Sequence, residues 1–150
     1  PLSVTLGVAN ASFVAQAVDW IPESLYQIVK AAYHHKGLSF VRILQRCPEW
    51  LPKLHEADMQ DPDNIQLLHH ENSLQISPSL SKVYRNMLQH DPLDMNRARE
   101  IASSTDRIPV GILYQNREIP CYEDTRKTDV IHTNEAVRSG LEYEFDKCAV

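Results

Sequence analysis

Glycine is scarce in this chain of 150 residues: only Gly7, Gly37, Gly111 and Gly140 occur, where average usage of about 7% would give roughly ten. No two of them lie close enough to form the glycine-rich loop that cradles a phosphate in dinucleotide-binding or P-loop proteins. The sequence therefore argues against a nucleotide site contained within this chain.

Long apolar runs and an excess of positive charge are also missing. The longest apolar stretches, residues 12–18 and 38–44, are far short of the roughly 20 residues that cross a bilayer. The chain has 15 Lys and Arg against 20 Asp and Glu, a net charge of −5, and no basic stripe that would bind nucleic acid. No secretion signal is recognisable. We therefore expect a cytoplasmic protein that binds neither membranes nor nucleic acid.

Cysteine is represented only by Cys47, Cys121 and Cys148. Their odd number and wide spacing do not fit a disulfide framework, so reduced thiols or a metal ligand fit better. The sequence begins with Pro1 and not with methionine, which favours a processed or excised piece of a longer protein.

Apolar residues make up 43% of the chain, which at this length is enough for a substantial core. Residues 12–17 predict a buried strand, and residues 22–36 predict a helix that Gly37 ends. Residues 38–45 predict a second strand, which ends just before Cys47. Two strands joined by a helix through short connections lie parallel in one sheet. The sequence therefore predicts an α/β fold that contains a βαβ unit.

The rest of the chain alternates polar connections with shorter elements. We expect a loop over residues 49–63, a strand over 65–68 in a small hairpin with 74–76, a helix over 80–89, a helix over 95–102 capped by Asp94, a strand over 108–114, and an extended or partly helical tail after 125 that orders only against a partner surface.

Several constellations that could support chemistry have simpler interpretations. In the pairs His34-His35 and His69-His70, adjacent side chains point to different faces, so neither pair can chelate one ion by itself. We interpret the first pair as solvated residues at a helix end and the second as polar residues at a turn or strand end. We interpret Asp58, Asp61 and Asp63 as residues of a solvated loop. The sequence contains no GxSxG motif that would supply a serine nucleophile.

Cys47 stands out because it follows the second strand of the βαβ unit, where binding and chemistry collect in parallel sheets. A cysteine in this position can simply be a small core residue. It can also be a ligand of a soft metal centre, but an iron–sulfur cluster normally needs four thiolates and this chain has three cysteines. If Cys47 is a cluster ligand, its companions must come from another chain or a missing segment.

Two groups of segments, in order, resemble the β subunit of 2-oxoacid:ferredoxin oxidoreductases, which binds thiamine diphosphate. The first group matches the second half of that subunit and ends in a Cys-Pro pair; the second matches its C-terminal stretch. The matching segments are Phe13-Val14-Ala15, His35-Lys36-Gly37, Leu38-Ser39-Phe40-Val41 and Leu44-Gln45-Arg46-Cys47-Pro48 in the first group, and residues 98–102, 106–114 and 119–123 in the second. Together they span residues 9–124.

The resemblance implies a reaction and its cofactors. Members of this family oxidatively decarboxylate a 2-oxoacid, pyruvate or 2-oxoglutarate, to an acyl-coenzyme A and pass the electrons to ferredoxin; thiamine diphosphate with magnesium stabilises the carbanion, and a [4Fe-4S] cluster carries the electrons. The cysteine before proline matches the family's fourth cluster ligand, which is Cys47 here. The resemblance assigns no acid or base to this chain. The family's GDGD-type segment and its other cluster cysteines lie upstream and have no counterpart here.

The resemblance also implies an organisation and partners. Residues 1–48 correspond to the end of the thiamine-binding α/β domain, residues 49–124 to a C-terminal extension, and residues 125–150 to a tail. The partners are the missing upstream half of the β subunit, an α subunit that forms a heterodimer with it, and ferredoxin. In this chain Cys47-Pro48 is followed by Glu49-Trp50-Leu51-Pro52 instead of the family's Thr, Tyr and Asn, and residues 53–76 have no counterpart.

Two alternatives belong to other functional classes. The chain could be a non-catalytic interaction module that keeps this half of the fold as a scaffold. It could also be a cysteine-dependent enzyme that uses Cys47, although no base stands nearby in the sequence.

Overall fold

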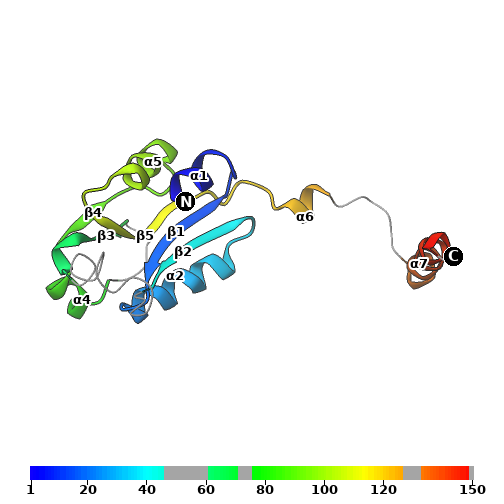
Figure 1. Ribbon diagram of the computed structural model, residues 1–150, viewed down its shortest axis with the longest axis horizontal. Coiled ribbons are helices and arrows are strands. Elements are labelled where there is room, and N and C mark those ends of the chain that lie inside the picture. The colour runs from blue at the N-terminus through cyan, green and yellow to red at the C-terminus, as the bar shows by residue number, and fades with distance from the viewer. Residues whose placement is uncertain (46–60, 71–75, 127–132, 149–150) are drawn as a thin grey trace.

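The computed structural model describes residues 1–45, 61–70, 76–126 and 133–148 (Figure 1). Cys47 and Asp58 lie outside these residues. The helices are α1 (Leu2–Gly7), α2 (Pro22–His34), α4 (Pro78–Val83), α5 (Met95–Ser103), α6 (Tyr122–Thr125) and α7 (Asn134–Cys148), with a 3-10 turn at Pro62–Asn64. The strands are β1 (Phe13–Val18), β2 (Ser39–Leu44), β3 (Ile65–His69), β4 (Met87–Gln89) and β5 (Ile108–Gln115).

The five strands form one mixed sheet in the order β2-β1-β5-β3-β4. β1 and β2 are parallel, and β3 is parallel to both β4 and β5; β1 and β5 are antiparallel, with a register shift between Val14 and Ala15. The predicted α/β fold with a βαβ unit is confirmed. The domain division at residue 48 stays a prediction, and the sheet takes strands from both sides of it.

Helices cover both faces of the sheet (Figure 1). On one face α2 packs on β1 and β2, and its buried Ile28 joins a core cluster with Phe13 and Val110. On the other face α1 and α5 lie side by side, and Leu6 and Ile101 join a second cluster. Because β1 lies between these layers, all six of its residues are buried, and such a strand is a continuous apolar run without strict alternation.

The structure contains the helix starts that the sequence predicts at Pro22 and Asp94. Pro22 stands in the first turn of α2, where a missing backbone N–H costs nothing. The Asp94 carboxylate caps α5 by accepting the backbone N–H groups of Asn96 and Arg97, both at 3.0 Å. The helix predicted to Lys36 ends at His34.

The structure differs from the sequence expectations at residues 80–89 and at the N-terminus. The helix predicted over residues 80–89 ends at Val83, and β4 follows, because residues 87–89 pair with β3 and that pairing outweighs the helical pattern of the segment. Of the expected hairpin of residues 65–68 with 74–76, residues 74 and 75 lie outside the described residues; β3 itself pairs with β4 and β5, both in parallel. The short helix α1 was not expected; its buried Leu2 and Leu6 stabilise it against the sheet.

The C-terminal tail after residue 125 contains the helix α7, and α6 lies just before it; Figure 1 draws both away from the sheet. The side chains described in α7 are all exposed, including those of Leu141 and Phe145. Of the expected extended or partly helical tail, the structure describes the helix α7, and its ordering against a partner stays a prediction. Among the described residues no helix is long and apolar enough to cross a membrane.

Candidate functional site

The carboxyl ends of β1 and β2 lie together at one edge of the sheet. The two strands are in register to their last residues, Val18 opposite Leu44, and the backbone N–H of Asp19 donates to the Leu44 carbonyl at 3.0 Å. We call this edge the carboxyl edge. Gln45 is the last described residue after β2. Cys47 is the candidate metal ligand of the sequence and lies outside the described residues, so its role stays a prediction.

Gln16 is a buried polar side chain in β1 that the sequence analysis missed. It is 1% exposed, and its Nε2 donates to the Pro109 carbonyl of β5 at 2.7 Å. Its Oε1 is buried and accepts no hydrogen bond within the described part of the chain. A buried acceptor without a donor destabilises the fold by roughly 1–3 kcal/mol. The signal was available, because Gln16 is the one polar residue in the run Phe13–Val18.

Side chains of Asn86 and Arg107 donate hydrogen bonds to the backbone carbonyl of Asp63, just before β3. Both strands begin on the side of the sheet where β1 ends, because β5 is antiparallel to β1 and parallel to β3. The Asp63 carbonyl accepts Asn86 Nδ2 at 2.8 Å and Arg107 Nε at 3.1 Å. The side chains of Asp61 and Asp63 are exposed, which confirms the interpretation of these two residues as a solvated loop.

The first histidine pair divides between solvent and core. His34 is exposed, whereas His35 is buried, so the expectation that both are solvated is wrong for His35. His35 Nε2 and Ser12 Oγ share a hydrogen bond of 2.8 Å, and the imidazole lies 5.4 Å from the Phe13 ring. Burial lowers the pKa of His35, and the positive charge of Arg117 adds to this effect. His35 is thus a neutral residue that joins the end of α2 to the start of β1.

A second group of histidines surrounds the ends of β3 and β4. The backbone N–H of His90 donates to the His69 carbonyl at 3.0 Å, and burial lowers the pKa of both His70 and His90. His90 is 4% exposed, and neither of its ring nitrogens reaches a partner of standard geometry among the described residues. The nearby backbone of Leu113 opposes the pKa shift. The sequence analysis did not single out His90, because nothing local shows its burial.

All five described histidines lie near the other ends of the strands, away from the carboxyl ends of β1 and β2. His35 stands at the start of β1, and the second group follows from the parallel course of β3 and β5, which run against β1. Within the described residues no three His, Cys, Asp or Glu side chains gather closely enough to hold a metal ion. The described histidines therefore contribute no acid or base to the carboxyl edge.

The two glycines with positive φ serve close packing and not the cradling of a phosphate. A Cβ at Gly37, whose φ is +127°, would lie 2.5 Å from Ser12 Oγ. A Cβ at Gly111, whose φ is +141°, would lie 2.8 Å from Leu68 Cβ. The space beside each glycine is filled by protein, so neither leaves room for a diphosphate.

Cys121 is the one cysteine whose side chain the structure describes, and it belongs to no group of three metal-ligating side chains among the described residues. Its Sγ donates to Asp124 Oδ2 at 3.0 Å, and this hydrogen bond raises the pKa of the thiol.

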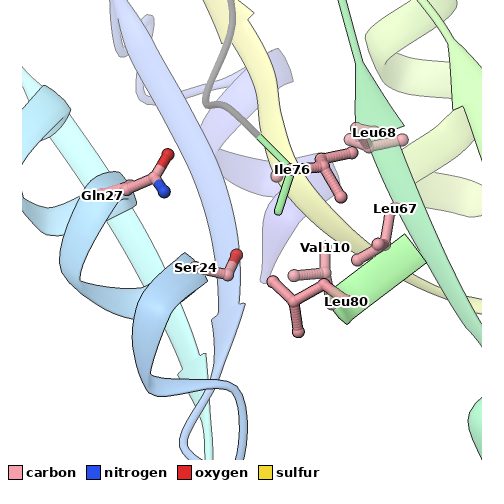
Figure 2. A pocket seen from close by; sticks show the side chains of 8 residues that line it. Ser24, Gln27, Leu67, Leu68, Ile76, Leu80 and Val110 are labelled. Carbon is pink, nitrogen blue, oxygen red and sulfur yellow. The ribbon is translucent and has the colours of Figure 1, made fainter. Parts of the chain in front are cut away.

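A small hollow of about 20 Å³ lies between α2 and α4 (Figure 2). Ser24 and Gln27 of α2 face an apolar wall across it; the wall consists of Leu67, Leu68, Ile76, Leu80, Val110 and Gly111. Among the described residues that line it there is no titratable side chain, so they offer no group for acid–base chemistry.

Comparison with known proteins identifies relatives for most of the chain. The family profile described as the C-terminal part of the pyruvate ferredoxin oxidoreductase beta subunit matches residues 80–129. The chain is 29% identical over 137 residues to a 2-oxoacid:ferredoxin oxidoreductase subunit beta of a Sulfolobus species, which covers 84% of this chain and 39% of that subunit. It is 44% identical over 48 residues, 32% of this chain and 13% of the relative, to the 2-oxoglutarate oxidoreductase subunit KorB of Mycobacterium tuberculosis.

A solved structure shares the fold. It is a 2-oxoglutarate:ferredoxin oxidoreductase from Magnetococcus marinus with 2-oxoglutarate, coenzyme A and succinyl-CoA bound. The similarity has a TM-score of 0.60 at 22% identity and covers 93% of this chain and 43% of the solved chain. This chain thus spans less than half the length of these relatives, and the resemblance inferred from the sequence is confirmed.

Proposed function

We propose that this chain, a relative of the β subunits of 2-oxoacid:ferredoxin oxidoreductases, supplies the C-terminal part of such a subunit in an enzyme that converts a 2-oxoacid to an acyl-coenzyme A with reduction of ferredoxin. The observation that carries the proposal is the similarity of fold over 93% of the chain together with the family profile over residues 80–129. An α subunit and ferredoxin are the partners this proposal requires.

The chain alone does not fit the cofactors of the whole enzyme. A [4Fe-4S] cluster is held by four thiolates, whereas this chain has three cysteines. The positive-φ glycines are packed against Ser12 and Leu68 and leave no cradle for the diphosphate. Thiamine diphosphate, magnesium and most of the cluster must therefore be held by other parts of the assembly.

Two roles remain for this chain in the proposal. The first is structural, because the rigid unit of β1, α2 and β2 ends at one shared edge, the usual place for binding in α/β sheets. The second is Cys47, two residues after Gln45, as a single ligand of a cluster whose other thiolates come from elsewhere. No described histidine stands at that edge, so we assign no acid or base to the chain.

For the substrate we propose 2-oxoglutarate as the first 2-oxoacid to assay and pyruvate as the second. The names of the Mycobacterium relative and of the solved Magnetococcus enzyme both specify 2-oxoglutarate. The described residues do not discriminate between the two acids.

The test is to co-express the chain with the remaining part of a β subunit and an α subunit, and to measure ferredoxin reduction with each 2-oxoacid and coenzyme A. Replacement of Cys47 with alanine should remove the iron of one cluster, about four atoms per heterodimer, and abolish ferredoxin reduction. Cys121→Ala is the matched control and should leave the iron content unchanged.

An assembled complex whose iron content does not change in Cys47→Ala refutes the ligand role. A complex that contains neither iron nor thiamine, yet binds its partner tightly, supports the alternative of a non-catalytic interaction module. Loss of a hydrolase or transferase activity of the isolated chain on alkylation of Cys47 would instead support a cysteine-dependent enzyme.

A further inference from the structure

We propose that the outer edge of β2 and the adjoining flank of α2 form a docking surface for the part of a β subunit that this chain does not contain. We call this surface the edge face and define it by Tyr26, Val29, Tyr33, Leu38 and Ile43. The inference rests on the proposed function, because that function supplies the occupant.

β2 is a long strand at the end of the sheet. It contains six residues, Ser39–Leu44, and pairs with β1 on one side; no other described strand pairs with it. An unpaired edge presents a row of N–H and C=O groups that another strand can join. β4, at the other end, has three residues and offers a much shorter edge. β2 is therefore the edge at which the sheet can be extended.

The exposed flank of α2 adjoins this edge. Ser24 and Gln27 line the pocket over β3 and β5, so their flank of α2 faces the middle of the sheet (Figure 2). At 100° per residue, Val29 and Tyr33 lie on the opposite flank, toward β2. Their side chains are 46% and 84% exposed, and Ile43 of β2 is 48% exposed.

Exposed apolar side chains thus stand on two elements, α2 and β2, that contact each other. Tyr26, one turn before Val29 on α2, adds an aromatic ring that is 66% exposed, and Leu38, just before β2, is also exposed. Exposed apolar surface that is continuous over neighbouring elements is typical of an interaction site, whereas single exposed apolar residues are ordinary.

The relatives indicate the occupant. The match covers 39% of the Sulfolobus subunit and 43% of the solved Magnetococcus chain, so more than half of each lies outside it. A strand from that part, followed by a helix, would complete the hydrogen bonds of β2 and cover the flank of α2, as each further βα unit does in an α/β sheet. The edge face is thus suited to an α/β segment and not to a small ligand.

A second copy of this chain is a less suitable occupant for electrostatic reasons. Lys30 and Lys36 are exposed around the edge face, and Arg42 lies on β2 itself. Two copies that paired through β2 would bring these positive charges together, and like charges across an interface oppose association. We therefore expect the occupant to carry acidic groups at its rim.

The experiment uses the full 150-residue chain and, as a separate polypeptide, the part of the Sulfolobus β subunit that lies outside the match. Binding is measured by titration calorimetry, and the stoichiometry by size-exclusion chromatography with light scattering. We expect a 1:1 complex. Ile43→Lys and Tyr33→Glu should each weaken it at least tenfold. Leu93→Lys is the matched control, because Leu93 is 63% exposed but stands outside the edge face, and it should bind as the parent does.

Hydrogen exchange locates the contact independently of affinity. On complex formation the amides of β2, residues 39–44, should exchange at least tenfold more slowly, while those of β4, residues 87–89, remain unchanged. Circular dichroism verifies that each variant is folded; Tyr33→Glu safeguards the test, since a side chain that is 84% exposed contributes little to the fold.

Every outcome decides the inference. Absence of binding by the parent chain, binding that is insensitive to Ile43→Lys and Tyr33→Glu, or self-association that Ile43→Lys abolishes would each overturn it. Failure of the proposed function appears differently, as an assembled complex without ferredoxin reduction in the presence of either 2-oxoacid, because the docking test measures no activity.

Discussion

Replacement of Gly37 with alanine tests the junction of α2, β1 and β2. The added Cβ would lie 2.5 Å from Ser12 Oγ, and the backbone φ of +127° is a conformation that residues with a Cβ rarely adopt. The backbone strain is worth about 1–3 kcal/mol. Displacement of the Ser12 hydroxyl from His35 Nε2, now at 2.8 Å, adds about 1 kcal/mol. We expect Gly37→Ala to lower the free energy of unfolding by about 2–4 kcal/mol.

A double-mutant cycle with Ser12→Ala separates the collision from the backbone strain. Ser12→Ala alone leaves His35 Nε2 buried without this partner and should cost about 1–3 kcal/mol. In that background the new Cβ meets no hydroxyl, so Gly37→Ala costs only the backbone strain, and the double variant should be about 1 kcal/mol more stable than the sum of the two effects predicts.

Urea denaturation followed by circular dichroism at pH 7.5 measures all four proteins. Gly7→Ala is the matched control, because nothing lies within 4 Å of a Cβ there and the residue is helical; it should be neutral or stabilising by up to about 1 kcal/mol. A loss below about 0.5 kcal/mol in Gly37→Ala, or strict additivity in the cycle, would refute the reasoning.

Three further predictions concern the second glycine, a buried histidine and a thiol. Gly111→Ala should also destabilise the fold by about 2–4 kcal/mol, since φ is +141° and the new Cβ would lie 2.8 Å from Leu68 Cβ; a denaturation midpoint equal to that of the parent would contradict this. Burial lowers the pKa of His90, so the unfolded state binds more protons and stability, complete above about pH 6.5, is lost as the pH falls. His90→Gln should therefore flatten the decrease in unfolding free energy between pH 7.5 and 5.5, and an unchanged slope would exclude His90 as its source. The Asp124 hydrogen bond raises the pKa of Cys121; Asp124→Asn should accelerate alkylation of Cys121 by iodoacetamide at pH 7.5, followed by peptide mass spectrometry, and a rate equal to that of the parent would refute the role of the carboxylate.

Local patterns in the sequence were reliable where one element is determined by its own residues. Pro22, the Asp94 cap and the apolar face of α2 are short-range signals, and each predicts an element that the structure contains. The segment over residues 80–89 failed for the opposite reason. Its apolar spacing fits a helix, yet residues 87–89 gain more by pairing with β3 than by extending α4.

The sequence predicted where the carboxyl edge lies, but it did not predict the long-range contacts of β1. The βαβ pattern alone indicates that the chain leaves β2 at the edge where β1 ends, which makes Cys47 a candidate. The hydrogen bond from Gln16 Nε2 to the Pro109 carbonyl joins residues that are 93 positions apart. A contact over that distance leaves no periodic trace in a single sequence.

The sequence by itself determined the class of this protein: the βαβ pattern predicts an α/β fold, and the order of the matching segments predicts a resemblance to part of the oxidoreductase β subunits. Only the tertiary structure decided how its few glycines are used. Gly37 and Gly111 are needed because backbone and side chains from distant segments approach them too closely for a Cβ. Close approach of that kind is a property of packing in three dimensions, and residue order alone does not specify it.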